Sequence, residues 1–192
     1  METNKKYKII YADPPWSYNS ASKKGTSRGV AERYYNVMDL ETIKKLPIGD
    51  LADKEGAVLF LWITYPHLHE LIEVLDAWGF EYKTVAFNWI KIYKNSKNPV
   101  LALGYWTRSN AEICVLATRG KDYPRRINKG VSQIIISPQR EHSRKPDIVR
   151  QKIIELVGDL PRIELFARER IEGWDCWGNE VPKDKQTLIK DE

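Results

Sequence analysis

The sequence predicts an α/β fold in which a mostly parallel sheet is flanked by helices. Two observations support this prediction. Short apolar runs typical of buried strands alternate along the chain with amphipathic helical patterns, which is the arrangement of right-handed β-α-β units. In addition, a length of 192 residues suits one domain, and no apolar run approaches the roughly 20 residues of a membrane span.

The strand predictions rest on apolar runs. Residues 8–12 form a short one, and residues 57–63 (AVLFLWI) are wholly apolar, as expected for a central parallel strand covered on both faces. Three further segments have a strand-like composition: residues 82–92, 112–118 and 162–167. The chain therefore carries five predicted strands.

Two segments have the spacing of an amphipathic helix. The first starts at Pro66 and stops before Gly79, and its apolar stripe is formed by Leu68, Leu71, Ile72, Leu75 and Trp78. The second starts at Pro146 and stops before Gly158, with Val149, Ile153, Leu156 and Val157 on one face. Proline at the start and glycine just past the end are typical helix boundaries.

Residues 19–35 and 118–132 are long, polar and basic, and fit no element. Loops of this length in a compact domain are usually functional or disordered. The net charge of +5 favours a polyanionic partner such as nucleic acid. Five residues of these loops are candidate phosphate contacts, the alternative being solvated surface charge: Lys23, Lys24, Arg28, Arg125 and Arg126.

Few residues suit metal binding or disulfide formation. The two cysteines, Cys114 and Cys176, make neither a disulfide framework nor a metal cluster, so we expect a cytoplasmic protein without a metal site. His67 and His69 are two residues apart, which points them to different sides of a helix, and we expect both at the surface. Residues 1–182 are predicted to form the domain, and 183–192 a charged, flexible tail.

The tetrapeptide Asp-Pro-Pro-Trp follows the first predicted strand, at residues 13–16. In open α/β sheets, ligands bind beyond the carboxyl ends of the strands. Arg168 follows the end of the last predicted strand. If these two strands are neighbours, the tetrapeptide and the segment from Glu164 to Arg168 share one cleft. The alternative for residues 13–16 is a rigid turn with a core tryptophan.

Several motifs, in order, resemble those of the DPPW-type adenine-N6 methyltransferases, which include the eukaryotic messenger-RNA adenosine methyltransferase and bacterial and phage relatives. The similar segments are DPPW (13–16), YYNVMDLETI (34–43), NWIK (88–91), GYWTRSNAEICVLATRG (104–120), HSRKPDIV (142–149), IELFARE (163–169) and GWDCWGNE (173–180). The resemblance implies a single Rossmann-like domain that uses S-adenosyl-L-methionine.

The residues suit methyl transfer to the adenine amine. That amine is a poor nucleophile, and two acceptors aimed at its hydrogens favour a more reactive geometry. Asp13 supplies a carboxylate, and the resemblance implies that the Pro14 carbonyl, held rigid by Pro15, supplies the other acceptor. Trp16 offers a ring on which a base can stack, worth about 1–3 kcal/mol. Tyr35 matches a family tyrosine that encloses the adenine, the alternative being a helix-entry residue.

The resemblance also implies a set of cofactor-binding residues. Glu164 matches the acid near the cofactor's sugar, and further positions beside the adenosine or the reaction centre are Asp13, Phe166, Arg168, Asn179 and Glu180. Glu180 replaces the family's glutamine and lacks its amide donors. Ser143 and Lys145, at a helix start, can hold the cofactor's carboxylate or a substrate phosphate, the alternative for Ser143 being a helix cap.

Three further positions depart from the eukaryotic pattern. Ala111 stands where the eukaryotic enzyme has a lysine, so that role is vacant or is taken by Arg108, Ser109 or Asn110. Arg170 and Ile171 stand where it has a histidine and an asparagine. No role is carried over to these last two residues.

The leading functional hypothesis is methyl transfer to adenine N6 in nucleic acid, with DNA favoured over RNA because the chain resembles the compact bacterial and phage members and carries no appended RNA-binding module. An RNA adenosine methyltransferase is the alternative substrate assignment.

Two alternatives belong to other functional classes. A non-catalytic nucleic-acid-binding subunit would be expected to lose part of the DPPW motif, which is intact here. A small-amine methyltransferase would leave the basic loops without a role. For partners, a homodimer or a partner subunit is left open, and no membrane association is expected.

Overall fold

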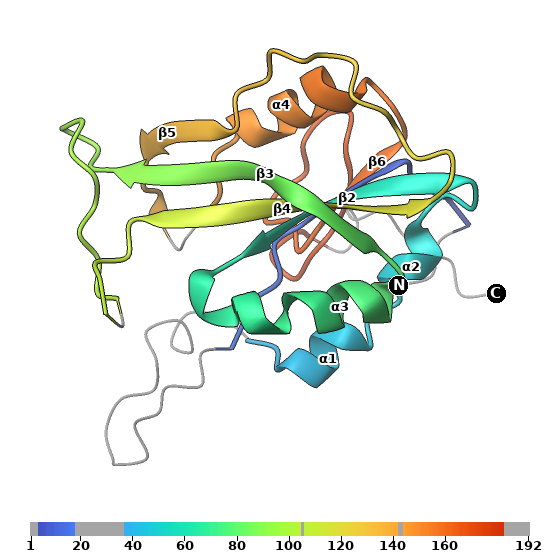
Figure 1. The fold of residues 1–192 in the computed structure, drawn as a ribbon, viewed down its shortest axis with the longest axis horizontal. Coiled ribbons are helices and arrows are strands. Elements are labelled where there is room, and N and C mark those ends of the chain that lie inside the picture. Colours follow the sequence, from blue (N-terminus) through green and yellow to red (C-terminus); the bar gives the residue numbers. More distant parts are fainter. Residues whose placement is uncertain (1–3, 18–36, 105, 142–143, 183–192) are drawn as a thin grey trace.

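The computed structural model describes residues 4–17, 37–104, 106–141 and 144–182. Its centre is a seven-stranded sheet in the order β5-β3-β4-β2-β1-β6-β7 (Figure 1). The strands are β1 (Ile9–Ala12), β2 (Gly56–Ile63), β3 (Glu81–Ile92), β4 (Ala111–Gly120), β5 (Ile134–Pro138), β6 (Arg162–Leu165) and β7 (Asp175–Trp177). The five predicted strands are present, and β5 and β7 are additional.

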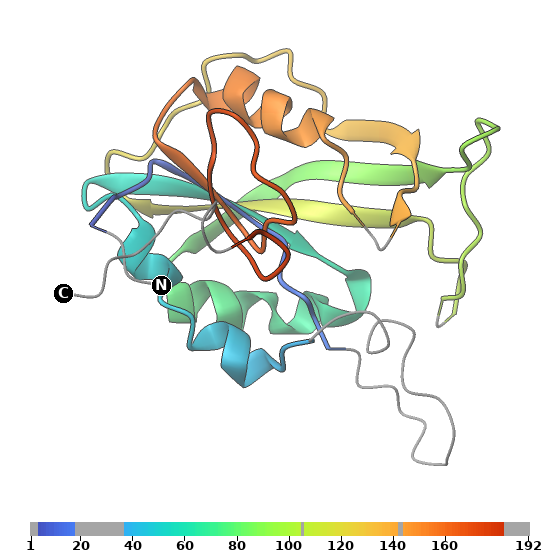
Figure 2. The same ribbon diagram turned by 180° about the vertical axis from the view of Figure 1, so that it is seen from behind.

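Helices cover both faces of the sheet. They are α1 (Leu40–Lys44), α2 (Ile48–Leu51), α3 (Leu71–Trp78) and α4 (Ile148–Val157), and a 3-10 helix, η2 (Tyr65–Glu70), precedes α3. Figures 1 and 2 show α1 and α3 on one face and α4 on the other. This arrangement confirms the predicted α/β fold, a mostly parallel sheet flanked by helices.

The sheet is mostly parallel, as predicted, with one exception. β1 pairs in parallel with β2 and β6, β6 with β7, and β3 with β5. β4 runs antiparallel to both β2 and β3, because residues 93–110 return the chain as a hairpin. As a result, β4 starts at the edge where β1, β2 and β6 end, and it ends at the opposite edge.

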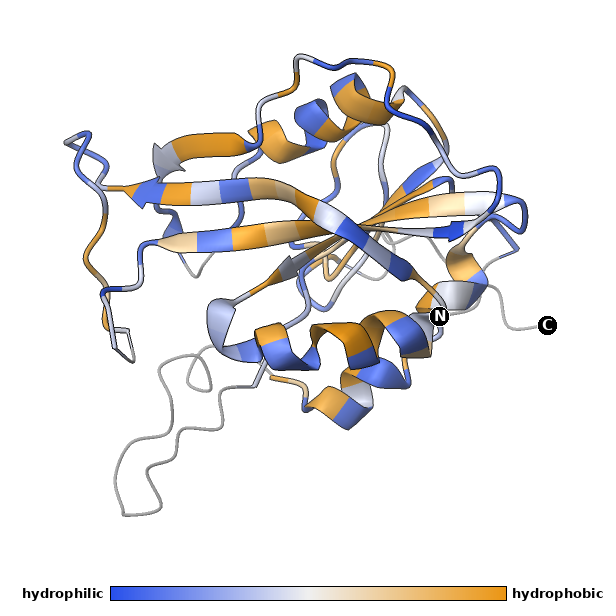
Figure 3. Cartoon of the chain, in the orientation of Figure 1, coloured by the Kyte–Doolittle hydropathy of each residue, from blue (hydrophilic) through white to orange (hydrophobic). Residues whose placement is uncertain are grey.

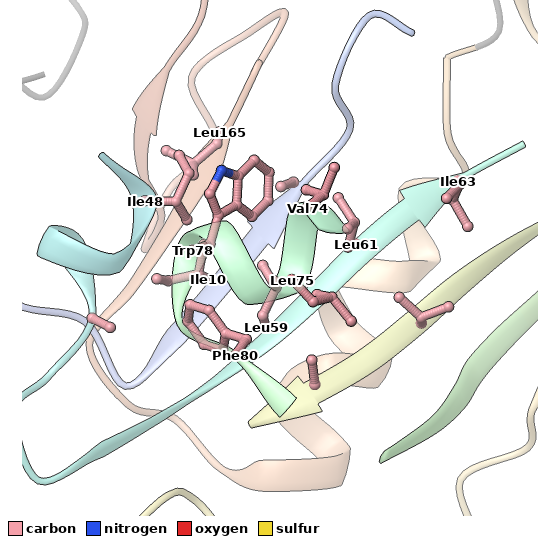
Figure 4. Close-up of a cluster of buried hydrophobic side chains, with 14 of the residues drawn as sticks. Ile10, Ile48, Leu59, Leu61, Ile63, Val74, Leu75, Trp78, Phe80 and Leu165 are labelled. Carbon is pink, nitrogen blue, oxygen red and sulfur yellow. The ribbon is translucent and has the colours of Figure 1, made fainter. Parts of the chain in front are cut away.

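The core lies on both sides of β2, whose eight residues are all buried. On one face, Trp78, Val74 and Leu75 of α3 pack over Leu59 and Leu61 (Figure 4). On the other face, Val149, Ile153 and Val157 of α4 pack over the sheet, as predicted, with Leu156 partly buried. Because β2 is apolar along its whole length, its side chains can pack against the helices on both faces of the sheet.

The buried stripe of α3 differs in phase from the prediction. Leu71, Val74, Leu75 and Trp78 are buried, whereas Leu68 is 40% and Ile72 53% exposed. Leu68 lies in η2, where three residues per turn replace 3.6, so it does not continue the stripe of α3. Figure 3 shows the resulting apolar and polar sides of α3. The helix ends at Gly79, whose φ of 74° is in the left-handed region, as predicted from the glycine.

No helix in the described ranges is long and apolar enough to cross a membrane. The predicted tail at 183–192 falls outside these ranges, so the structure does not test it.

Candidate active site

The ends of β1 and β6 lie side by side. Ala12 pairs with Leu165, so Asp13 and Phe166 leave the sheet as neighbours. The two strands are therefore neighbours, which was the condition for the tetrapeptide and the segment from Glu164 to Arg168 to share one cleft. The cleft is lined by Tyr11, Asp13, Arg144, Lys145, Arg150, Glu164, Phe166, Arg168 and Glu169. Its volume is only about 20 Å³, and ion pairs span it.

Backbone hydrogen bonds fix the Asp-Pro-Pro-Trp corner. The Trp16 amide donates to the Pro14 carbonyl at 2.9 Å, and the Pro15 carbonyl accepts from the Met38 amide at 2.9 Å. The Ser17 amide donates to the Met38 carbonyl at 3.2 Å. The corner is thus held by the segment that enters α1. A rigid corner sets the position of the Asp13 carboxylate and the Pro14 carbonyl relative to each other.

Trp16 is packed inside the protein and is only 6% exposed. Its indole Nε1 donates to the Trp62 carbonyl at 3.1 Å, and its ring stacks on His67 with the centroids 5.4 Å apart. The ring borders a cavity of about 320 Å³ that is also lined by Met38 and Glu70. The ring is therefore buried, as in the alternative of a core tryptophan, and base stacking on it stays a prediction.

His67 is buried, so the prediction of a surface position for it was wrong, whereas His69 is exposed as predicted. His67 Nδ1 lies 2.8 Å from the Thr64 hydroxyl and Nε2 lies 2.9 Å from the Ser17 carbonyl. The imidazole therefore links η2 to the Asp-Pro-Pro-Trp corner. Among the described residues, no group of three or more potential ligands forms a metal site.

Asp13 is paired with Lys145. The Lys145 Nζ lies 2.8 Å from Oδ1 and 2.9 Å from Oδ2 of Asp13. Burial raises the pKa of the Asp13 carboxyl above its ordinary value of 3.8, and the Lys145 ammonium opposes that shift. Although burial disfavours an ammonium, the carboxylates around Lys145 raise its pKa well above 10.5. Lys145 is therefore a permanent cation and cannot act as a base.

A second acid, Glu112, reaches the same lysine from β4. Its Oε2 lies 3.1 Å from Lys145 Nζ, and its Oε1 accepts from Lys91 of β3. Burial alone would raise the pKa of Glu112, but the ammonium groups of Lys145 and Lys91 outweigh that effect and lower it. Neither Glu112 nor Lys91 was among the predicted site residues.

Glu164 projects from β6 into the cleft and is bound by Arg150 of α4. The Arg150 Nε lies 2.6 Å from Oε2 of Glu164, and Nη2 lies 2.8 Å from Oε1. Such a two-pronged contact fixes the plane of the carboxylate. Burial raises the pKa of Glu164, and the Arg150 guanidinium opposes that shift. Arg150 was not predicted.

The remaining residues after β6 surround the same end of the sheet. Phe166 has a φ of 61°, which is unusual for a residue with a bulky side chain, and its ring packs edge-on against Trp177 at 5.6 Å. Strained backbone of this kind is concentrated at functional sites. Arg168 Nε lies 3.5 Å from Oε1 of Glu180, and Asn179 is exposed. The two predicted cofactor residues Arg168 and Glu180 therefore pair with each other.

Arg125 and Arg126 do not belong to this cleft. Their loop starts at the amino end of β2, where the amides of Lys121 and Asp122 donate to the Glu55 carbonyl. That end is roughly 17 Å along the strand from the residue that pairs with Ala12. The antiparallel direction of β4 carries this loop to the opposite edge of the sheet from the cleft, and the role of the two arginines as phosphate contacts stays a prediction.

The hairpin between β3 and β4 contains Arg108, Ser109 and Asn110. The Ser109 backbone pairs with Ala102, and the Asn110 carbonyl accepts from the Lys91 amide at 2.9 Å. These residues close the base of the hairpin at the carboxyl edge of the sheet, and Arg108 is exposed. Five predicted residues lie outside the described ranges: Lys23, Lys24, Arg28, Tyr35 and Ser143.

The missed residues left a signal in the sequence. Glu112 and Lys91 are isolated charges inside otherwise apolar strand segments, and charges in such places are almost always paired. Arg150 lies on the same helix as the buried Val149 and Ile153, one residue from the apolar stripe. What the sequence lacks is the identity of each partner, which depends on strand order.

The fold and the cleft define a class of protein, a Rossmann-like methyltransferase with an acid-Pro-Pro-aromatic corner after its first strand. The family comparison agrees: the MT-A70 family model matches residues 7–180. The chain belongs to the MT-A70 family, which consists of adenine N6 methyltransferases.

Individual relatives support the same assignment. The chain is 34% identical to the type II methyltransferase M.MunI of Mycoplasma sp. over 195 aligned residues, which cover 94% of this chain and 80% of that protein. It is 29% identical to the N6-methyladenosine RNA methyltransferase MTA1 of Cryphonectria parasitica, covering 94% of this chain and 53% of MTA1. With the human catalytic subunit METTL3 the identity is 27%, covering 92% of this chain and 28% of METTL3.

Proposed function

We propose that this protein transfers a methyl group from S-adenosyl-L-methionine to the N6 amino group of adenine in DNA, with the reaction at the end of β1. The observation that carries the proposal is the pairing of Ala12 with Leu165. It places the Asp13 carboxylate, suited to an amine, beside Glu164, suited to a sugar, in one cleft. The motifs had predicted that Asp13 and Glu164 share one cleft if their strands are neighbours.

The donor set of the cleft fits the proposed cofactor. Glu164 presents a buried carboxylate that can accept from the hydroxyls of a ribose. Lys145 and Arg168 are cations that suit the cofactor's carboxylate, and Phe166 offers an aromatic ring. Because the cleft is narrow, we propose that the partly exposed pair of Arg144 and Glu169 separates on binding. The bound cofactor supplies an electrophilic methyl group on a sulfonium sulfur.

Asp13 and Pro14 would act on the adenine amine. One oxygen of Asp13 accepts a hydrogen bond from N6, and the Pro14 carbonyl accepts the other with the lone pair that Trp16 does not use. Methylation of N6 by the bound cofactor would release a proton from the amine, for which the Asp13 carboxylate is the nearby acceptor. Its raised pKa suits that role, and its side chain is 26% exposed, so the proton can pass to water.

DNA is the proposed substrate for two reasons. The chain is more similar to the type II methyltransferase M.MunI, at 34% identity, than to the N6-methyladenosine RNA methyltransferase MTA1, at 29%. The net charge of +5 suits a phosphate backbone. In a duplex the adenine would have to leave the base stack to reach Asp13, at a cost of a few kcal/mol. We also propose a cytoplasmic location, consistent with a sequence that contains only two cysteines.

A methyl-transfer assay tests this proposal. The protein is incubated with radiolabelled cofactor and single- or double-stranded DNA or RNA of matched sequence, followed by nucleoside analysis. We expect label in N6-methyldeoxyadenosine, and none from oligonucleotides that lack adenine. Label confined to RNA would assign the alternative substrate. Absence of label from every nucleic acid, with intact cofactor binding, would refute the proposed reaction.

A further inference from the structure

Four charged side chains form an alternating chain from the reaction centre into the sheet. Asp13 contacts Lys145, Lys145 contacts Glu112 at 3.1 Å, and Glu112 contacts Lys91. They come from four places in the fold. Asp13 follows β1 and Lys145 precedes α4, whereas Glu112 belongs to β4 and Lys91 to β3. Two negative and two positive charges balance along the chain.

Lys91 is the member that the proposed reaction does not explain. It is 9% exposed and does not line the cleft at Asp13. Its Nζ lies 5.1 Å from the centre of the Trp89 ring and contacts Glu112. Burying a lysine is costly, and buried ion pairs are often no more stabilising than well-packed apolar residues. A role in electrostatics at the site gives this buried cation a function.

The charges around Asp13 indicate how Lys91 can influence the pKa of the Asp13 carboxyl. Lys145 and Arg168 lower the pKa of Asp13 against the effect of burial, whereas Glu112 raises it. Glu164 and the buried Cys114 thiol also interact electrostatically with Asp13. Lys91 neutralises Glu112. Without it, Lys145 would be shared between two uncompensated carboxylates.

We infer that Lys91 is a positioning residue: through Glu112, it keeps the Lys145 ammonium on the Asp13 carboxylate and Asp13 ionised. The inference rests on the proposed function for the role of Asp13 in transfer. Lys91 touches neither substrate nor cofactor in this account. It acts by balancing the charge of Glu112, which is two contacts away from Asp13.

Paired substitutions of opposite sign test this inference. Lys91→Met removes a positive charge and Glu112→Gln a negative one, each with little change in volume. We expect the carboxyl titration of Asp13, followed by ¹³C NMR and assigned with Asp13→Asn, to move up by about one pH unit in Lys91→Met and down in Glu112→Gln. The double variant restores the balance, and its midpoint is expected near that of the wild type. The acid limb of the pH–rate profile for methyl transfer should follow the same order.

The controls separate charge from structure. Lys91→Arg should keep the wild-type midpoint, and Lys94→Met, which changes a nearby exposed lysine, should leave it unmoved. If Lys91→Met does not fold, Lys91→Gln takes its place. Midpoints that stay fixed, or that move in the same direction in both single variants, would overturn the inference. So would shifted midpoints with an unchanged pH–rate profile.

The NMR result also distinguishes this inference from the proposed function. If the wild type methylates adenine but the midpoints do not move, only the role of Lys91 is lost. If the wild type methylates no adenine, the role of Lys91 in the reaction falls together with the proposed function, whatever the midpoints show.

Discussion

Asp13→Ala is expected to lower the rate of methyl transfer by about 10³-fold, the range seen when one preorganised group at a reaction centre is removed. The substitution deletes the acceptor for the adenine amine and the acceptor for its proton. It also removes one of the carboxylates that contact Lys145, so that more of its positive charge faces the sulfonium and the amine. Each of these effects slows the same step.

The rate is measured in single turnover with saturating cofactor, so that binding and product release do not enter. Asp159→Ala, which removes an exposed acid paired with Arg162 at the opposite edge of the sheet, is the matched control and should keep the wild-type rate. A folded Asp13→Ala variant within tenfold of the wild type would show that another group holds the amine.

Lys145→Met is expected to lower the free energy of unfolding by about 3 kcal/mol at pH 8, with a smaller loss at pH 5. The substitution leaves the carboxylates of Asp13 and Glu112 buried without their shared cation. Their pKa values then rise, and acids whose pKa is raised by folding destabilise the protein as the pH rises. Lys145 itself is protonated at both values, since both lie below 10.5.

Urea denaturation at pH 5 and pH 8 checks this prediction. Lys94→Met is a control at an exposed lysine and should change the free energy of unfolding by no more than about 0.5 kcal/mol. An equal loss at the two pH values would contradict the titration of the two acids as its cause and indicate loss of the contact between the Lys145 ammonium and the Trp62 ring instead.

The sequence was sufficient for the strands and helices whose apolar pattern is continuous. The run at 57–63 could only be a doubly covered strand, and Gly79 and Gly158 marked two helix ends. The direction of β4 was not predictable, because apolar runs look alike in parallel and antiparallel strands. β5 and β7 were missed because β5 is an edge strand with alternating exposure and β7 has only three residues.

The site was predictable where motifs lie at strand ends. Asp13, Lys145, Glu164, Phe166 and Arg168 line one cleft in the structure. Arg150 and Glu112 were not predictable as partners, because each contact joins elements far apart in the sequence. For Trp16 the motif did not reveal the hydrogen bond to the Trp62 carbonyl, which anchors the ring at the corner, and base stacking on the ring stays a prediction.

The central claim is that one cleft holds the cofactor on the β6 side and the adenine amine on the β1 side. Calorimetric titration with S-adenosylhomocysteine, the product of the cofactor, tests it most directly on the wild type, Glu164→Gln and Asp13→Ala. The account predicts that Glu164→Gln weakens binding by about tenfold or more, since one hydrogen bond to a charged group is worth about 1.5–3 kcal/mol. Asp13→Ala should bind within about twofold of the wild type. Equal weakening by the two folded variants, or none in Glu164→Gln, would contradict this division of the cleft.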